Sequence, residues 1–222
     1  MTRRTALLAG SSGLVGGLAL TRLLASSTYD KVVTLVRRPS GLAHAKLAEK
    51  VFDFDTLEGA LTLPKVDDVF CCLGTTIKNA GSQAQFRKVD FDFVVGLARA
   101  TKAAGASQFL LVSALGASAS SKVFYSRVKG EAEEAVKAVG FDATFIFQPS
   151  ILDGHRKEHR FGERAGLVVA RAVSGLLQGS LRKYRPTSAD DVAHAMLTAA
   201  SKGLRGVHVY DGEALRLLAH EG

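Results

Sequence analysis

Cysteine and proline are both scarce in this chain, and their scarcity excludes several classes of protein. The 222 residues include 2 cysteines and 4 prolines. Cys71 and Cys72 are neighbours, so they offer neither a disulfide framework nor the spacing of a metal site, and buried thiols in a strand are the simpler interpretation. Free thiols suit a reducing compartment, so we expect a cytoplasmic protein. The few prolines and the lack of low-complexity segments predict a chain without a disordered tail.

Long apolar runs are also missing, which argues against a membrane protein. No segment reaches the roughly 18 uninterrupted apolar residues that a spanning helix needs. The stretch after Thr2-Arg3-Arg4 imitates a secretory or twin-arginine leader, but glycines and Arg22 interrupt it. We therefore expect no leader and no membrane partner.

Acidic residues are outnumbered, because 29 Lys and Arg face 21 Asp and Glu, a formal net charge of +8. This balance permits nucleic acids or anionic small molecules as partners. The basic residues form no continuous run and are not interleaved with aromatics, so we expect a small-molecule substrate and no nucleic acid. His155 and His159 lie four apart without a dependable carboxylate partner, so we expect no metal site. We expect a monomer or a homodimer.

Short apolar runs alternate with helical patterns along the chain, as in βαβ units with a parallel sheet. The predicted strands are Thr5–Ala9, Lys31–Val36, Lys50–Asp53, Val66–Leu73, Gln108–Ser113, Phe141–Phe147 and Gly206–Tyr210. The predicted helices are Leu14–Ala25, Gln83–Ala104, Lys122–Val139, Ala165–Leu177, Thr187–Ala200 and Glu213–Ala219. We therefore predict an α/β fold with a doubly wound parallel sheet of the Rossmann type. Residues 1–222 would form one domain, in which a small C-terminal region, 149–222, covers the cofactor and supplies the substrate pocket.

A glycine-rich turn lies between the first predicted strand and the first predicted helix, as a dinucleotide-binding turn requires. Gly10 allows a tight turn, Gly13 lets a pyrophosphate approach the backbone N–H groups, and Gly16 lets helix and strand pack closely. We assign cofactor binding to the whole turn: Gly10, Ser11, Ser12, Gly13, Leu14, Val15 and Gly16.

The end of the second predicted strand lacks the acid that commonly binds the ribose of NAD. It carries Arg37 and Arg38 instead, and a guanidinium binds the 2′-phosphate of NADP whereas a carboxylate repels it. NADP (NADPH) is therefore predicted over NAD, with a solvated strand end as the alternative. Asp53, after the third strand, could accept a hydrogen bond from the adenine amino group, and the alternative is an ordinary carboxylate in a turn. Small residues after the fourth strand suit a close approach to the ribose: Leu73, Gly74, Thr75 and Thr76.

Three residues at the fifth strand and the following helix carry the predicted chemistry. Tyr125 and Lys129 are four apart, roughly 40° on a helical wheel, so they share a face beside the apolar one. The ammonium favours the phenolate, which lets Tyr125 exchange a proton near neutral pH. Ser113 closes an apolar strand and would hydrogen-bond the substrate oxygen. On the same helical wheel, the other polar residues of this helix are predicted to point away from this face and from the core: Arg127, Glu133, Glu134 and Lys137.

Together these residues resemble the atypical or extended branch of the short-chain dehydrogenase/reductase superfamily, and within it the Tat-interacting-protein-like oxidoreductases. The matching segments span nearly the whole chain: Asp53-Phe54, residues 71–76, Val89-Asp90, Ser113, residues 125–131 and residues 160–163. The chain departs from the pattern at Ala114, where relatives commonly have a second serine, and at Gln148, where they often have arginine.

By that resemblance, Tyr125 would be the general acid/base, and Lys129 its activator and a ligand of the nicotinamide ribose. Ser113 would orient the substrate oxygen, while Leu152 and Arg160 would approach the nicotinamide end. Phe54 would lie with Asp53 in the cofactor site. The resemblance thus implies an NADP-dependent reductase or dehydrogenase acting on a carbonyl or an alcohol. Two alternatives are a nucleotide-sugar epimerase or dehydratase, and a non-enzymatic NADP(H)-responsive regulator that binds a protein.

Overall fold

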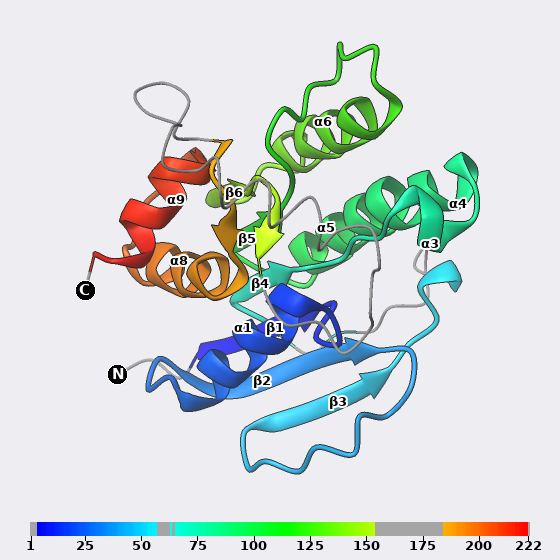
Figure 1. Cartoon of the computed structure of the whole chain (residues 1–222). Helices are drawn as coiled ribbons and strands as arrows, with labels where there is room; N and C mark the ends of the chain where they lie inside the picture. Colours follow the sequence, from blue (N-terminus) through cyan, green and yellow to red (C-terminus); the bar gives the residue numbers. More distant parts are fainter. Residues whose placement is uncertain (1–3, 57–62, 64, 154–183, 222) are drawn as a thin grey trace.

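Seven strands pair in parallel to form one sheet (Figure 1). The computed structural model describes residues 4–56, 63, 65–153 and 184–221. The seven strands are β1 (Arg4–Ala9), β2 (Tyr29–Val36), β3 (Leu47–Val51), β4 (Asp68–Cys71), β5 (Gln108–Val112), β6 (Ala143–Gln148) and β9 (Gly206–Asp211). Their spatial order is β3-β2-β1-β4-β5-β6-β9. The predicted doubly wound parallel α/β fold is confirmed.

The strand order reverses between β1 and β4, which are neighbours in the sheet although β2 and β3 separate them in the chain. In open α/β sheets, ligands bind outside the carboxyl ends of the strands at such a switch point. Here the carboxyl ends of the two strands are fixed together, because Ala9 pairs with Cys71 and the Cys72 N–H donates to the Ala9 carbonyl at 2.9 Å. The topology therefore places the glycine turn beside the loop that follows β4.

Helices cover both faces of the sheet (Figure 1). The described helices are α1 (Leu14–Ala25), α3 (Ile77–Ala80), α4 (Gln83–Arg87), α5 (Phe93–Ala103), α6 (Phe124–Ala138), α8 (Ala189–Ser201) and α9 (Gly212–Ala219). Helix α8 contacts both α1 and α9 on one face, and α5 contacts α6 on the other. Ser188 caps α8 by accepting N–H bonds from Asp190 and Asp191, as the sequence predicted for this helix start.

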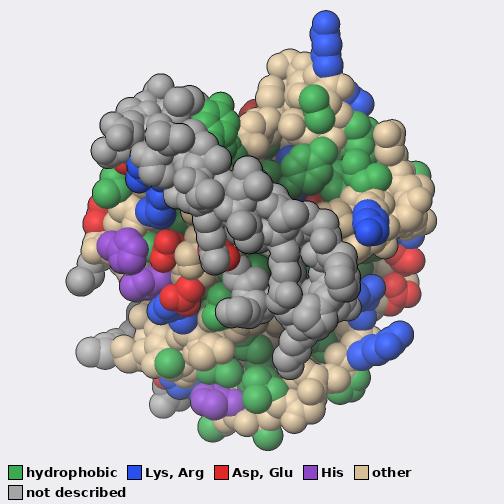
Figure 2. All heavy atoms as spheres, viewed as in Figure 1, with side chains coloured by type: hydrophobic (Ala, Val, Ile, Leu, Met, Phe, Trp, Pro, Cys, Tyr) green, Lys and Arg blue, Asp and Glu red, His purple; other side chains and the backbone are tan. Residues whose placement is uncertain are grey.

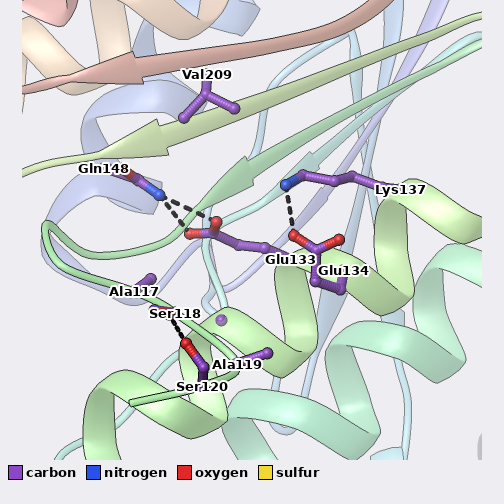
Figure 3. A pocket seen from close by; sticks show the side chains of 10 residues that line it. Ala117, Ser118, Ala119, Ser120, Glu133, Glu134, Lys137, Gln148 and Val209 are labelled. Carbon is purple, nitrogen blue, oxygen red and sulfur yellow. Dashed lines mark hydrogen bonds and ion pairs between the residues drawn. The ribbon is translucent and has the colours of Figure 1, made fainter.

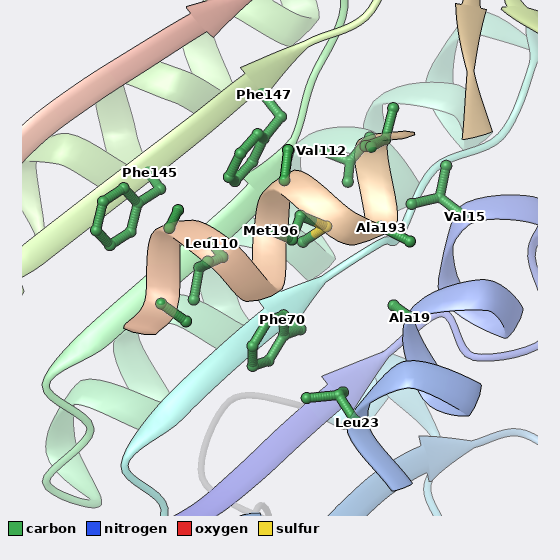
Figure 4. Packing of buried hydrophobic residues seen from close by; sticks show 14 of the residues in the cluster. Val15, Ala19, Leu23, Phe70, Leu110, Val112, Phe145, Phe147, Ala193 and Met196 are labelled. Carbon is green, nitrogen blue, oxygen red and sulfur yellow. The ribbon is translucent and has the colours of Figure 1, made fainter. Parts of the chain in front are cut away.

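Two buried clusters divide along the alternation of the strands. Leu8 of β1 belongs to the cluster under α1 and α8, whereas its neighbour Leu7 belongs to the cluster under α5. In the first cluster, Met196 of α8 joins Phe70 of β4 and Phe147 of β6 (Figure 4). Each large side chain buried in this way contributes roughly 1.5–3 kcal/mol, so these clusters hold both helical layers against the sheet.

Two predicted elements differ from those in the structure, and one short helix is additional. The third strand is Leu47–Val51 rather than residues 50–53, because this edge strand is fixed by its backbone pairing with β2 and is half-exposed throughout most of its length. The long helix from Gln83 is present, but a π-helical turn, η2 (Lys88–Asp92), separates α4 from α5. The short helix α3 before it was not predicted.

Two smaller features complete the described fold. A 3-10 turn, η1 (Phe54–Thr56), follows β3, and the short strands β7 (Leu152–Asp153) and β8 (Thr187–Ser188) pair with each other. The helix predicted at 165–177 lies outside the described residues. Because α8 and β9 come from the C-terminal region, that region contributes one strand to the seven-stranded sheet and one helix to its α1-side layer. Its predicted role as a cover of the cofactor stays a prediction.

Candidate functional site

The glycine turn leaves no room for side chains at two of its three glycines. Gly10 has a φ of 86°, a left-handed conformation, and a Cβ there would lie 2.5 Å from the Cys72 carbonyl oxygen. A Cβ at Gly16 would lie 2.0 Å from the Gly10 carbonyl oxygen, while one at Gly13 would meet it at 3.2 Å. Gly13 is the N-cap of α1, where unpaired N–H groups and the helix dipole favour an anion. The geometry suits the pyrophosphate predicted for this turn.

Tyr125 and Lys129 stand one turn apart on α6 and both contact the helical segment that includes the π turn. The Tyr125 ring is half-buried and packs on Phe86 of α4, with 5.4 Å between ring centroids. Lys129 is 6% exposed, and its Nζ lies 2.8 Å from Oδ1 of Asp90, a buried residue of η2. Asp90 also accepts the backbone N–H of Thr75 at 2.9 Å through its other oxygen. This network joins α6, the π turn and the loop after β4.

The charge of Lys129 is stabilised by this arrangement. Burial by itself lowers the pKa of Lys129, but the Asp90 carboxylate and the nearby Tyr125 raise it, and the net pKa is above the ordinary lysine value. An ammonium has three N–H donors, so Lys129 keeps donors beyond the pair with Asp90. Lys129 is therefore a fixed cation one turn from the tyrosine.

Ser113 is held by a different partner from the one expected. Its N–H donates to the Phe147 carbonyl at 2.7 Å, which continues the pairing of β5 with β6. Its hydroxyl donates to Glu133 of α6, and Gln148 Nε2 donates to both oxygens of the same carboxylate at 3.0 Å. Within the described residues, no hydrogen bond joins Ser113 to Tyr125 or Lys129.

The prediction that Glu133 points away from the core is wrong. This side chain is 4% exposed, since it follows Lys129 by one further turn and lies on the same flank of α6, facing the ends of β5 and β6. Burial raises the pKa of Glu133, while the hydrogen bonds from Ser113 and Gln148 lower it in part. The spacing Tyr-x-x-x-Lys-x-x-x-Glu carried this signal, since each interval of four advances only about 40° around the helix.

Asp90 is the second residue of the site to which the sequence assigned no role. It was recognised only within the Val89-Asp90 match, because a regular helix gives no reason to bury an acid there. The π turn changes the phase of the helix, and Asp90 is 1% exposed as a result of this local geometry and the fold around it.

The remaining predicted cofactor residues lie along the same carboxyl edge of the sheet. Arg37 and Arg38 directly follow β2 and are exposed, without an ion pair to any described residue. Asp53 is exposed, and its Oδ1 accepts the Asp55 N–H at 3.0 Å, so it caps the η1 turn. Phe54 is buried between Phe52 and Phe93, which gives it a packing role.

The loop after β4 and the chain after β6 hold the other predicted residues. Thr76 accepts the Asn79 N–H and caps α3, while Leu73 is half-buried and Gly74 exposed. A Cβ at Gly74 would lie 3.3 Å from Asp90 Oδ1, so this glycine borders the Lys129 network directly. Leu152 is half-buried in β7, and Arg160 lies outside the described residues.

A hollow of ≈ 460 Å³ lies beside α6, at a place that sequence reasoning did not identify (Figure 3). Its lining includes Glu133, Glu134, Lys137, Gln148 and Val209. Among the described residues no cluster of metal-ligating side chains occurs, and no described helix is long and apolar enough to cross a membrane. In Figure 2 the visible Lys and Arg side chains are spread around the face, with Asp and Glu among them.

Sequence comparison identifies the family of this fold. Residues 10–202 match the family described as NAD(P)H-binding. The protein fmp52-1, mitochondrial, of Aspergillus terreus is 37% identical over 206 residues, covering 90% of this chain and 88% of the relative. The HTATIP2 protein of Rattus norvegicus is 34% identical over 201 residues, covering 89% and 81%.

Solved structures share the fold at low identity. MoeE5 in complex with UDP-glucuronic acid and NAD has a TM-score of 0.70 at 19% identity, with 94% of this chain and 76% of MoeE5 covered. UDP-glucose 4-epimerase of Thermotoga maritima has a TM-score of 0.67 at 18% identity, with 96% and 81% covered. This likeness shows the fold alone.

The prediction of a cytoplasmic protein is contradicted by these relatives. Several fungal relatives, from Aspergillus terreus, Aspergillus niger and Coccidioides immitis, are named as mitochondrial proteins. Free thiols indicate only that a compartment is reducing, whereas the compartment of a protein is decided by a targeting signal that a receptor recognises. Cysteine usage therefore had no power to distinguish one reducing compartment from another.

Proposed function

The chain belongs to the NAD(P)H-binding family and is an atypical short-chain dehydrogenase/reductase related to HTATIP2, and from this premise we propose that it is an NADP-dependent oxidoreductase. Its substrate is a carbonyl compound or the corresponding alcohol. The observation that carries the proposal is the buried Lys129, paired with Asp90 at 2.8 Å and one helical turn from Tyr125. A phenol one helical turn from a fixed cation fits general acid/base catalysis, in which a positioned side chain transfers the proton.

The roles follow from the positions of the side chains. A bound nicotinamide would supply or accept the hydride at the substrate carbon. Tyr125 gives its phenolic proton to the carbonyl oxygen during reduction and takes the proton from the hydroxyl during oxidation. Lys129 holds a positive charge one helical turn from the phenol, and its N–H donors beyond the pair with Asp90 suit a ribose hydroxyl. Asp90 holds the ammonium in place and connects it to the Thr75 backbone.

The chain's own residues fit a dinucleotide. A Cβ at Gly10 or Gly16 would clash with a backbone carbonyl oxygen, so these two glycines allow the turn, β4 and α1 to pack closely. Gly13 is the N-cap of α1, where the helix N–H groups favour an anion such as phosphate. Arg37 and Arg38 support NADP, since both are exposed at the end of β2, where a 2′-phosphate would be recognised. A charge-assisted hydrogen bond to that phosphate is worth about 1.5–3 kcal/mol, or one to two decades in affinity.

A turnover screen tests the activity. Purified protein is incubated with NADPH and a panel of aldehydes, diacetyl and quinones, and loss of NADPH absorbance is followed. Turnover of at least one carbonyl is expected. Tight NADPH binding with no turnover across the panel would contradict the enzymatic proposal and favour the NADP(H)-responsive regulator.

Calorimetric titration tests the cofactor preference separately. The wild type is expected to bind NADPH more tightly than NADH. Replacing both Arg37 and Arg38 by alanine should weaken NADPH by about one to two decades or more and leave NADH nearly unchanged. Equal affinities of the wild type for both cofactors would show that the two arginines are only a solvated strand end.

A further inference from the structure

Glu133 is a buried carboxylate that the proposed chemistry leaves without a role, and it lies against the serine of the site. We propose that Glu133 is a positioning residue that sets the direction of the hydrogen bond made by Ser113. The inference rests on the proposed oxidoreductase function, since it assigns the hydrogen-bonding state of Ser113 at the site of that reaction.

The contacts show how Glu133 acts on the serine. A serine hydroxyl has one O–H donor and two acceptor lone pairs. In the structure the Ser113 hydroxyl donates to Glu133, so its single donor is used and only acceptor capacity remains. Both side chains are almost fully buried, at 6% and 4% exposure, so the hydrogen bond is shielded from competition by bulk water.

Gln148 fixes the carboxylate itself. Its Nε2 donates to both Glu133 oxygens at 3.0 Å, so the carboxylate is held at the end of β6 by a neutral amide (Figure 3). The other charged groups that act on Glu133 among the described residues are Lys129 and Lys137, both on α6. Lys137 is in turn paired with Glu134 at 2.8 Å. The two side chains that donate hydrogen bonds to Glu133 are those of Ser113 and Gln148, and both are uncharged.

The hollow beside α6 gives this carboxylate a route for proton exchange. Glu133 and Gln148 line the ≈ 460 Å³ space, together with Lys137 and Glu134 (Figure 3). The lining of this space includes neither Tyr125 nor Lys129, so a proton that reaches Glu133 from it need not pass the general acid/base. Burial raises the pKa of Glu133, which brings its protonation closer to the working range of an enzyme.

The direction of the hydrogen bond decides what Ser113 can bind. With Glu133 ionised, Ser113 donates to it and can only accept a hydrogen bond from another group. With Glu133 protonated, the acid donates to the serine oxygen, and the Ser113 O–H is free to donate to a carbonyl oxygen. Carbonyl reduction should therefore lose efficiency as pH rises through the pKa of Glu133, because the protonated fraction falls.

An NMR titration of the glutamate carboxyl carbons tests the coupling without any substrate. The Glu133 signal is assigned as the one missing from Glu133→Gln. Ser113→Ala should raise the pKa of Glu133 by about one unit, a tenfold change in its protonation constant, because the ionised form loses a donor. Gln148→Leu should also raise the pKa of Glu133, because the ionised form again loses a donor. An unchanged Glu133 titration in Ser113→Ala would overturn the proposal.

The pH profile of kcat/KM tests the consequence, with diacetyl or the best carbonyl of the screen and NADPH. The wild-type value should fall by up to tenfold per pH unit above the Glu133 pKa. The Glu133→Gln variant should not show this decrease of kcat/KM, because its side-chain amide donates a hydrogen bond to Ser113 at every pH. A separate pH dependence that arises from the general acid should remain. Glu134→Gln removes the same charge from the neighbouring exposed position and should keep the wild-type profile.

The two arms separate this proposal from the proposed function. Persistence of the wild-type limb in a folded Glu133→Gln enzyme would refute the positioning role. If Glu133→Gln fails to fold, Gln148→Leu replaces it, and the limb should then move to higher pH together with the NMR-derived pKa. Absence of turnover with every carbonyl would contradict the proposed function, and the NMR coupling would then decide on Ser113 and Glu133 alone.

Discussion

At the scale of single residues, the site is built from groups that hold one another rather than from isolated catalytic side chains. Lys129 is paired with Asp90, Asp90 binds the Thr75 N–H, and Ser113 is bound by Glu133. Each of these contacts joins residues that are distant in the sequence. A substitution should therefore have different effects on catalysis and on stability, according to which member it removes.

Tyr125→Phe should lower kcat by roughly 10² to 10⁴ and leave NADPH affinity nearly unchanged, because it removes only the transferable proton. Steady-state kinetics and calorimetric titration measure the two effects. Tyr210→Phe provides the control, since that tyrosine stacks on Phe147 from β9 and has no assigned chemistry. An unchanged kcat in the Tyr125 variant would exclude its role as general acid/base.

Asp90→Asn should lower the free energy of unfolding by about 3 kcal/mol, because an unpaired ammonium stays buried. Urea unfolding at neutral pH measures the loss, and Asp92→Asn, an exposed position two residues later, should change little. The folded-state pKa of Lys129 lies above the ordinary 10.5, so the pair stabilises the wild type below that pH. This contribution should disappear as pH rises through the folded-state pKa. Equal stabilities of the two variants at neutral pH would contradict the ion pair.

At the scale of elements, two local distortions shape the site. The glycine turn brings the start of α1 against the carboxyl end of β1, and the π turn places Asp90 opposite α6. π turns within α-helices occur frequently at functional sites. The first distortion has a sequence signal in its glycines, whereas the second has none that propensity reveals.

Two adjacent glycines in α1 give opposite predictions. Gly16→Ala should destabilise the protein by about 1–3 kcal/mol and weaken NADPH, since its Cβ would lie 2.0 Å from a backbone carbonyl oxygen. Gly17→Ala should stabilise by roughly 0.5–1 kcal/mol, because its Cβ would have an ordinary contact at 3.5 Å and alanine favours a helix. Thermal unfolding measures both changes. An unchanged stability of Gly16→Ala would show that the turn can accommodate a Cβ at position 16.

At the scale of the whole molecule, the reversal of strand order between β1 and β4 brings the separate parts of the site to one edge of the sheet. The glycine turn follows β1, the arginines follow β2, and the Thr75 loop follows β4. A ligand that contacts all three segments should stabilise the entire fold, since the same sheet supports them.

NADPH at a hundred times its Kd should therefore stabilise the folded protein by about 2.7 kcal/mol. Thermal unfolding with NADPH and NADH at equal concentration measures the difference, and NADPH should give the larger shift. Added salt should reduce the NADPH advantage, because exposed Arg37 and Arg38 would bind the 2′-phosphate through screened charges. A salt-independent advantage would point to another source of selectivity.

The sequence by itself determined the fold class and much of the candidate site. Alternating strand and helix periods, with glycines at 10, 13 and 16, predicted the parallel sheet and the turn at its carboxyl edge. These features are local, since a turn needs glycine where a Cβ would clash and a buried strand needs apolar residues. The spacing of Tyr125 and Lys129 likewise placed them on one face of a helix.

The tertiary structure decided which polar groups became buried partners. Asp90 and Glu133 look like surface acids in the sequence, yet each reaches a residue far along the chain, Lys129 in one case and Ser113 and Gln148 in the other. The edge strand β3 also shifted from its predicted position, because pairing with β2 rather than its own side chains fixes it. Helix phase and strand pairing depend on contacts across the whole folded chain. Local sequence patterns therefore predicted the proposed catalytic residues, whereas the tertiary structure determined which groups hold them in place.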